Sequence, residues 1–491
     1  LQSEVEEELI THLRENEVYM EGNQTWTVKF SSLGGRGIFA RRNIEQGELV
    51  YVDAPLLMGP RCGQKHLPIC VTCYKNDCPL FPCDHGCGLP VCSNECQNSP
   101  KHVNYECNYL RRLSPTCGTN WSTDLLLAVT PIRALFMTEQ QRRCLATFQS
   151  HQTLAYGREV ELLCRNVAES VPEEDVKLMK HVCGSFNTNS FETVSVHDKD
   201  HSSSLRALYP MGALQNHCCV PNTRHHFDGE QRLYMTASLP IRAGEEITMT
   251  YTSLFWDTTM RRQFLHATKH FWCNCERCSD PTEFGSMLGA LFCAFENCSG
   301  ILLPQEPLNP TSPWTCDQCK KSINSRQVLN NFRILNHKNL DDEYRFAKPR
   351  QLLKFIQKEF RHVVPASNYL MMDMKFRIVS YFGRSTGLSW KDLTDAELAV
   401  KRSYCIDLLS NLDILQCGDC KKKGLILYEL HSTKAEEIRR YKNTHDEYNK
   451  DSQNILKNDM MENERVLVKA TDILQNDILA TTARQNDEVL Q

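Results

Sequence analysis

The hydrophobic pattern of the chain is mixed up to about residue 325 and purely helical beyond it. Near the start, apolar residues at Val5, Leu9 and Leu13 recur among glutamates, which predicts an amphipathic helix over residues 1–18. Alternation over residues 26–30 predicts a short strand, and residues 233–237 are predicted to form another. The first part of the chain therefore combines helices and strands as an α+β protein does.

Two stretches have helical spacing throughout. In residues 121–183 we expect helices over 125–136, 139–149 and 159–169, and another that begins after Pro172 with acidic residues at its positive end. We expect this block to pack and to carry no chemistry. A polar hairpin tip is predicted over 196–204. From residue 326 onward helices follow one another, and the last is predicted over 464–480 after the polar stretch 441–458.

Three short segments combine polar and apolar residues in a way that suggests a site. Asn216 and His217 are flanked by apolar residues, as at a buried pocket, and Pro221 with Asn222 suits a turn. Residues 244–251 open on a turn glycine and alternate like a strand that ends at Tyr251. Three cysteines then form a C-x-C-x2-C cluster that lacks one partner for tetrahedral zinc, and a fourth cysteine lies in the first segment: Cys273, Cys275, Cys278 and Cys219.

Cysteine pairs with a nearby histidine fill residues 70–107. The candidate ligands are Cys70, Cys73, Cys83, Cys87, Cys92, Cys96, His102 and Cys107. Eight ligands suffice for two four-coordinate zinc ions. The segment is too polar for a core of its own, so metal would supply its folding energy, roughly 10–16 kcal/mol per structural zinc in finger peptides. A disulfide cluster is the alternative, but the acidic N-terminal stretch does not look like an export signal.

A second cysteine set surrounds the proline-rich loop 304–313. Its members are Cys293, Cys298, Cys316 and Cys319. The spacing predicts a zinc ribbon, with reduced structural thiols as the alternative. Cys417 and Cys420 have no second pair close by, and we interpret them as ordinary cysteines at a helix end.

Charge and hydropathy exclude two kinds of partner. The formal net charge is −4, and the sequence pI is about 6.5. Without a basic excess we do not expect nucleic acid as a direct ligand. Apolar runs stay far below the ~20 residues that span a bilayer, so we expect no membrane partner.

The three segments, in this order, resemble the second half of a SET domain. The family motif NHSCxPN corresponds to residues 216–222, its GEELTxxY strand to residues 244–251, and its post-SET cysteines to residues 273–278. The glycine-rich stretch 33–40, which alone would be taken for a hairpin, then matches the first SET motif. The cysteine pairs of 70–107 resemble a MYND finger. A MYND finger inserted at this point is similar to the SET-and-MYND family, and the arthropod branch looks closest.

The resemblance implies an interleaved pairing of zinc ligands. One ion would be held by Cys70, Cys73, Cys92 and Cys96, and the other by Cys83, Cys87, His102 and Cys107. The spacing departs from the MYND pattern in three places around the second ion. His85 or Cys78 could therefore substitute as a ligand there.

The resemblance also implies a cofactor, S-adenosylmethionine, and a set of residues for it. The cofactor-binding residues would be Gly35, Arg36, Gly37, Asn216, His217, Tyr251 and Phe271. Tyr251 would be the catalytic residue, with its hydroxyl orienting the substrate amine. Phe271 could stack on adenine. Three zinc ions are expected, and a fourth if the ribbon forms.

The implied architecture is a β-rich SET domain split by a MYND finger, with a helical insert, a post-SET zinc site and an all-α tetratricopeptide-like C-terminal domain. The expected boundaries are 1–60 for the first part of the SET domain, 62–110 for the finger, 111–183 for the insert, 184–257 for the SET core, 258–281 for the post-SET motif, 286–325 for the ribbon and 326–491 for the C-terminal domain.

One departure concerns the expected activity. Relatives often carry a tyrosine four residues before the cysteine triplet, where this chain has Lys269. A cation there would repel both an ammonium substrate and the sulfonium of the cofactor unless it swings outward.

We therefore weigh two functions. The first is methylation of lysine in a protein substrate, histone or not. The second is a zinc-containing adaptor that recruits partners in transcriptional repression, proline-rich peptides among them. A monomer in nucleus and cytoplasm is the family expectation.

Overall fold

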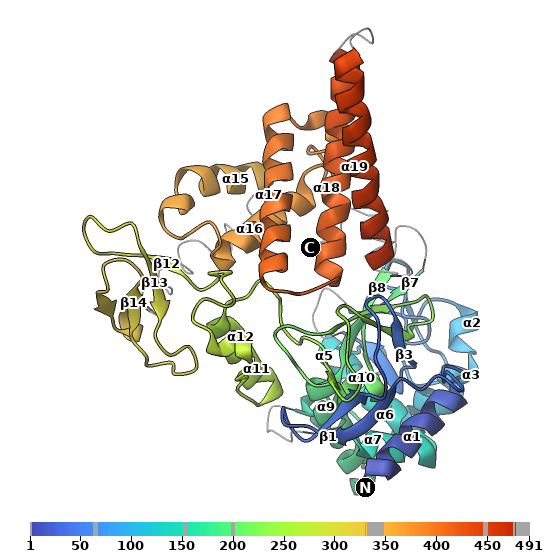
Figure 1. Cartoon of the computed structure of the whole chain (residues 1–491). Helices are drawn as coiled ribbons and strands as arrows, with labels where there is room; N and C mark the ends of the chain where they lie inside the picture. Colours follow the sequence, from blue (N-terminus) through green and yellow to red (C-terminus); the bar gives the residue numbers. More distant parts are fainter. Residues whose placement is uncertain are drawn as a thin grey trace.

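The computed structural model describes residues 2–61, 67–150, 156–197, 202–328, 330, 348–444, 450–474 and 477. Figure 1 shows three parts: a mixed lower body, a small ribbon of strands beside it and a helical part above it. Predictions for Leu1, for the hairpin tip at 198–201 and for residues 478–480 of the last helix lie outside the described residues.

Three small antiparallel sheets form the SET body. The first has the order β1 (Trp26–Phe30), β2 (Arg36–Ala40), β11 (Glu246–Ile247). The second has the order β3 (Leu49–Asp53), β10 (Leu233–Ala237), β9 (Thr223–Phe227). The third has the order β4 (Leu57–Pro60), β8 (Ser202–Leu208), β7 (Phe191–Val196). The two strands predicted over 26–30 and 233–237, β1 and β10, have the expected bounds.

The core of this body joins the chain start to the first two sheets. Helix α1 (Gln2–Glu15) buries Leu9 and Leu13 against Trp26 of β1 and Ile38 of β2. These side chains lie in one apolar cluster with Met235 of β10. The predicted apolar stripe therefore faces the sheets, and burial of such side chains stabilises the fold by roughly 1.5–3 kcal/mol each.

The MYND finger projects from the sheets between β4 and the helical insert. It contains β5 (Phe81–Pro82), β6 (Pro90–Val91), α2 (Asn94–Gln97), α3 (Pro100–His102) and η2 (Val103–Cys107). The insert follows with α4 (Asn108–Leu113), α5 (Thr123–Leu126), α6 (Val129–Ala134), α7 (Glu139–Ala146), α8 (Arg158–Arg165) and α9 (Glu173–Asn189).

The insert differs from the predicted helices in two respects. The helix expected over 125–136 is divided into α5 and α6, so that Pro131 falls in a first turn, where its missing N–H is not needed. Helix α9 continues to Asn189 and crosses the expected boundary between insert and SET core at 183.

Besides β9, β10 and β11, residues 210–323 form three short helices and a small ribbon of strands. Helix α10 (Pro210–Leu214) precedes the Asn216 segment, and α11 (Thr258–Lys269) and α12 (Glu276–Ser279) flank the cysteine triplet. A four-stranded ribbon follows in the order β12 (Leu291–Phe292), β13 (Ile301–Pro304), β14 (Trp314–Cys316), β15 (Ser322–Ile323).

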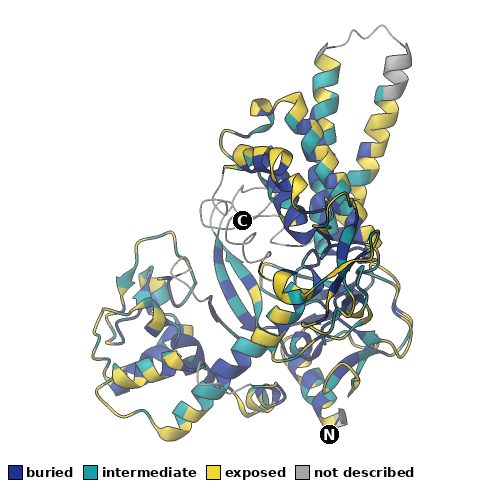
Figure 2. Cartoon of the chain, turned by 90° about the vertical axis from the view of Figure 1, so that its left-hand side faces the viewer, coloured by how far each residue is buried: buried dark blue, intermediate teal, exposed yellow. Residues whose placement is uncertain are grey.

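The regular elements that the structure describes in the C-terminal part are all helices. Its elements are α15 (Pro349–Lys358), η3 (Phe360–His362), α16 (Tyr369–Tyr381), η4 (Trp390–Asp392), α17 (Asp395–Ile414), α18 (Lys421–Thr444) and α19 (Lys450–Leu474). The long pair α18 and α19 stands out from the body, and exposed positions dominate the outer part of α19 (Figure 2). No helix among the described residues is long and apolar enough to cross a membrane.

Candidate active site

The Asn216 segment lies against the end of the strand that leads to Tyr251. The Met249 N–H donates to the Asn216 carbonyl at 3.0 Å, and the Cys218 N–H donates to the Met249 carbonyl at 2.8 Å. The Asn222 side chain donates to the Glu246 carbonyl at 2.8 Å and accepts from the Thr248 N–H at 2.8 Å. The strand predicted over 244–251 therefore pairs with β2 only at β11, because its second half bonds to this segment instead.

The Asn216 side chain ties three segments together. Its Nδ2 donates to the Arg36 carbonyl at 3.0 Å and to Glu246 Oε1 at 2.7 Å. The other Glu246 oxygen accepts from the Ser31 hydroxyl at 2.7 Å. A Cβ at Gly37 would lie 2.9 Å from Asn216 Nδ2, so this close approach requires glycine. Gly37 thus lies behind the site wall, and Glu246 is a positioning residue that the motif analysis missed.

His217 connects Tyr251 to a cysteine cluster. Its Nδ1 accepts from the Tyr251 N–H at 3.0 Å, so the ring proton lies on Nε2, which is 3.2 Å from Cys219 Sγ. Burial lowers the pKa of His217 to about 3, which keeps the ring neutral. The Tyr251 hydroxyl donates to the Gln215 carbonyl at 2.6 Å. Both ends of Tyr251 are therefore held by the Asn216 segment.

A cavity of about 270 Å³ opens beside these residues. Its lining residues come from segments far apart in the sequence: Leu33, Gly34, Gly35, Arg36, Thr147, Phe148, Gln149, Thr188, Asn189, Ala213, Leu214, Asn216, His217, Tyr251, Lys269, His270 and Phe271. Six of the seven predicted cofactor residues line it, and Gly37 does not.

The helical insert contributes to this cavity, contrary to the expectation that it only packs. Thr147, Phe148 and Gln149 follow the end of α7 and line the cavity wall. The Arg36 guanidinium donates to the Thr147 carbonyl at 2.5 Å and so joins the glycine-rich stretch to the insert. No motif marks these residues in the sequence. A polar turn after an amphipathic helix is the only local signal.

A second cavity of about 220 Å³ lies against the first. It is lined by Thr188, Asn189, Ser190, Phe191, Glu192, Gly212, Ala213, His225, Met249, Tyr251 and Lys269. Five lining residues belong to both cavities: Thr188, Asn189, Ala213, Tyr251 and Lys269. We call these five residues the seam.

Lys269 is directed into the seam and does not swing outward. Its Nζ donates to the Thr188 carbonyl near the end of α9 at 2.6 Å. The same nitrogen lies 5.5 Å from the centre of the Tyr251 ring. Burial lowers the pKa of Lys269 below its ordinary value.

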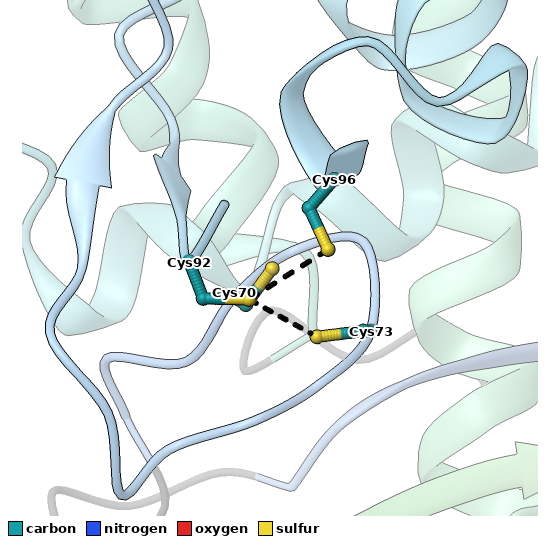
Figure 3. A group of neighbouring side chains, drawn as sticks. All are labelled: Cys70, Cys73, Cys92 and Cys96. Atoms are coloured by element: carbon teal, nitrogen blue, oxygen red, sulfur yellow. Dashed lines mark hydrogen bonds between the residues drawn. The ribbon is translucent and has the colours of Figure 1, made fainter. Parts of the chain in front are cut away.

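The sixteen predicted metal ligands form four compact groups. They are Cys70, Cys73, Cys92 and Cys96; Cys83, Cys87, His102 and Cys107; Cys219, Cys273, Cys275 and Cys278; and Cys293, Cys298, Cys316 and Cys319. Within each group the ligand atoms lie within 4.8 Å of one another. In the first group the sulfur of Cys92 lies 3.5 Å from that of Cys73 and 3.6 Å from that of Cys96 (Figure 3).

These separations suit tetrahedral zinc. A Zn–S bond of about 2.3 Å places tetrahedral sulfurs about 3.8 Å apart. The sulfur of Cys219 is 3.9 Å from that of Cys273 and 3.5 Å from that of Cys278. In the ribbon the closest pairs are 3.5 and 3.7 Å apart. The donor sets therefore fit four zinc ions.

The second finger group contains His102, as the interleaved pairing implies. His85, the alternative ligand, lies 3.0 Å from Asn98 Oδ1 instead. His102 Nε2 faces the Cys83 and Cys87 sulfurs at 3.3 and 3.6 Å. Its Nδ1 lies 3.0 Å from Glu106 Oε1.

A buried guanidinium offsets part of the negative charge of the thiolates in the post-SET group. Arg261 of α11 donates to Cys219 Sγ at 3.2 Å and to Cys278 Sγ at 3.4 Å. The carboxylate of Glu283 holds both Arg261 and Arg277, at 2.6 and 3.0 Å. Four thiolates and one zinc ion carry a net charge of −2, so a neighbouring cation lowers the cost of burying them.

Comparisons with known proteins identify the family of this chain. A model of the SET domain matches residues 35–252. The chain is 33% identical over 418 residues to SET domain-containing protein SmydA-8, isoform B, of Drosophila melanogaster, covering 83% of this chain and 90% of that protein. It is 26% identical over 276 residues to N-lysine methyltransferase SMYD2-B of Xenopus laevis, covering 52% of this chain and 62% of that protein.

A solved SET domain, that of LSMT bound to lysine and AdoHcy, aligns with a TM-score of 0.32 at 10% identity over 99% of this chain and 91% of that one. The likeness to SmydA-8 extends over nearly the whole of that protein. This chain belongs to the SET-and-MYND family, as the motifs predicted.

Proposed function

We propose that this protein transfers methyl groups from S-adenosylmethionine to lysine side chains of other proteins. The observation that carries the proposal is the pair of cavities that meet at Tyr251. One cavity is bounded by the glycine-rich stretch and the Asn216 segment, and the other shares Tyr251 with it and is bounded by Phe191, His225 and Met249. A methyl donor and an acceptor amine need this arrangement, because they must approach in line from two sides.

The residues of the first cavity fit the donor. Backbone groups of Gly34, Gly35 and Arg36 and the ring of Phe271 would hold its nucleoside and amino-acid parts, with Asn216 and His217 fixing the wall between them. Gly35 has a φ of +61°, which suits a backbone bent around a ligand. S-adenosylmethionine supplies the chemistry, a methyl group on a positively charged sulfur.

The second cavity suits an amine that has lost its proton. A lysine amine has an ordinary pKa of about 10.4 and must be neutral to attack. Phe191, Met249 and Tyr251 give this cavity an apolar wall. Burial lowers the pKa of His225 to about 4, so this wall residue is neutral too. These apolar side chains favour the neutral amine, and the proton can leave to water before attack.

A radiolabelled methyl-transfer assay on a protein extract tests the proposal. We expect labelled protein with the native chain and about 100-fold less with Tyr251→Phe, the scale of a small misalignment of reacting groups. Binding of S-adenosylmethionine, measured by calorimetry, should persist in this variant. Tyr234→Phe is the matched control, since Tyr234 stacks on His226 outside both cavities. Equal turnover in both variants would remove Tyr251 from the catalytic role.

The adaptor function is the second candidate, and the ammonium of Lys269 in the seam is the observation in its favour. An empty calorimetric titration with S-adenosylmethionine would leave only the adaptor. Histones as substrates, proline-rich peptides at the finger, a monomeric state and residence in nucleus and cytoplasm stay predictions from the resemblance.

A further inference from the structure

Lys269 has the surroundings that the proposed reaction requires of an acceptor lysine. Its amine lies in the seam, the set of residues shared by the donor cavity and the acceptor cavity. A methyl group that passes from one cavity to the other must cross this seam. Among the seam residues Lys269 alone carries an amine.

Two contacts and its burial suit this amine to accept a methyl group. The Thr188 carbonyl accepts one of its N–H groups at 2.6 Å, which fixes the direction of the nitrogen. The Tyr251 ring lies 5.5 Å away and forms the opposite wall. The side chain is half-buried at the end of α11, between Tyr251 and the end of α9, and burial favours the neutral amine. The described lysines elsewhere in the chain line neither cavity.

We propose that Lys269 is a methyl acceptor within its own chain. This inference rests on the proposed function, because it needs S-adenosylmethionine as the methyl donor. The neutral Nζ attacks the methyl carbon, and the N–C bond forms as the S–C bond breaks. The electron pair of the broken bond stays on sulfur, which leaves as the neutral thioether, and the extra proton on nitrogen leaves to water.

The modification would change the seam. Each added methyl group removes one N–H donor and enlarges the head of the side chain. A lysine that carries three methyl groups has no hydrogen left for the Thr188 carbonyl, so its contact with α9 is lost. Self-methylation would thus alter the seam, next to which the side chain of an external lysine has to bind.

The main test uses the purified full chain with methyl-labelled S-adenosylmethionine and no other protein. We expect the label on the peptide that contains Lys269, identified by mass spectrometry, at a level per chain that does not depend on protein concentration. Lys269→Arg should abolish this label. Lys177 is an exposed residue of α9, the helix that supplies the Thr188 carbonyl, and Lys177→Arg should keep the label.

A binding measurement gives a second readout that needs no turnover. Lys269 must lose its proton before it attacks, and until then its ammonium repels the sulfonium of the donor. Lys269→Met removes this ammonium and should therefore raise the affinity for cationic S-adenosylmethionine several-fold relative to the neutral thioether product. Lys177→Met should leave this ratio unchanged. Calorimetry with both ligands also shows whether each variant keeps a folded donor cavity.

The outcomes separate this inference from the proposed function. If an external protein is labelled while Lys269 stays unmodified, the methyltransferase stands and the self-methylation is wrong. Label that rises per chain with protein concentration also overturns it, since the acceptor would then be reached from a second molecule. Absence of donor binding in calorimetry overturns both proposals.

Discussion

At the scale of single residues, two glutamates join polar groups from different segments of the chain. Glu246 holds Asn216 and Ser31, and Glu283 holds two arginines beside a cysteine cluster. Such pairs could not be found from the motifs, because a glutamate in a strand or a loop is normally solvated. The motif residues themselves, Asn216 and His217, were recognisable since they interrupt an apolar context.

Asp257 is the residue for which we expect a measurable pH effect. Burial and the nearby Glu283 charge raise the pKa of Asp257 to about 7. The folded state then binds the proton more tightly than the unfolded state, so stability falls as pH rises from about 4 through 7. Asp257→Asn keeps an acceptor for the Met260 N–H and removes this dependence.

Thermal unfolding at pH 5.5 and pH 8 measures the Asp257 effect. The native chain should lose about 1–2 kcal/mol more than Asp257→Asn between these values, because a pKa of about 7 limits the effect in this pH window to about 2 kcal/mol. Asp124→Asn, an exposed residue in the first turn of α5, should behave like the native chain. A parallel pH profile for Asp257→Asn and the native chain would contradict the assignment.

At the scale of elements, the last helix was predicted over 464–480, but α19 begins at Lys450, within the polar stretch 441–458. Local patterns located β1 and β10 at their observed bounds. They failed where tertiary bonds compete with local preference. The second half of the 244–251 strand leaves the sheet because Asn216 and Cys218 take its backbone bonds. The predicted helix over 125–136 is interrupted because Pro131 cannot donate a bond to the preceding turn.

The finger and the helical insert are coupled by a carboxylate. Glu106 of η2 contacts His102 Nδ1, and it accepts from Arg133 of α6 at 2.5 and 3.0 Å. Arg133 also donates to the Val71 carbonyl at 2.6 Å, within the first ligand loop. The insert thus helps to orient a ligand of the second finger zinc.

Glu106→Gln should weaken zinc at the second finger group. A buried carboxylate that orients a histidine ligand typically contributes 10- to 100-fold in metal affinity, so we expect a loss of about that size in a chelator competition assay. Glu95→Gln, an exposed substitution in α2 beside the first finger group, is the control. Equal chelator resistance of the two variants would exclude the coupling.

At the scale of the whole molecule, metal-binding loops hold the small β-elements together. The finger and the ribbon contain strands of two to four residues. Hairpins this short are not stable alone, so zinc must supply much of their folding free energy. The post-SET group has a further effect, since Cys219 contacts His217, which in turn holds the Tyr251 backbone.

Metal analysis of the purified chain should find about four zinc ions, one for each ligand group. Cys293→Ser should reduce this number to about three, with the cavities intact. Cys417→Ser, at a buried cysteine outside the four groups, should leave the zinc content unchanged. A count of three zinc ions in the native chain would show that the ribbon cysteines are reduced thiols.

The sequence by itself determined the sixteen candidate zinc ligands and the motif residues around Tyr251, because cysteine spacing and polar residues in apolar contexts are local properties. The family and the interleaved pairing of the finger ligands came from the resemblance of these motifs to known ones. Only the tertiary structure decided which other residues complete the two cavities. Thr147 to Gln149, Thr188 and Glu246 reach the site because packing brings the insert, the end of α9 and β11 to one place. The direction of Lys269 was likewise settled by a carbonyl 81 residues away in the chain, which no local pattern contains.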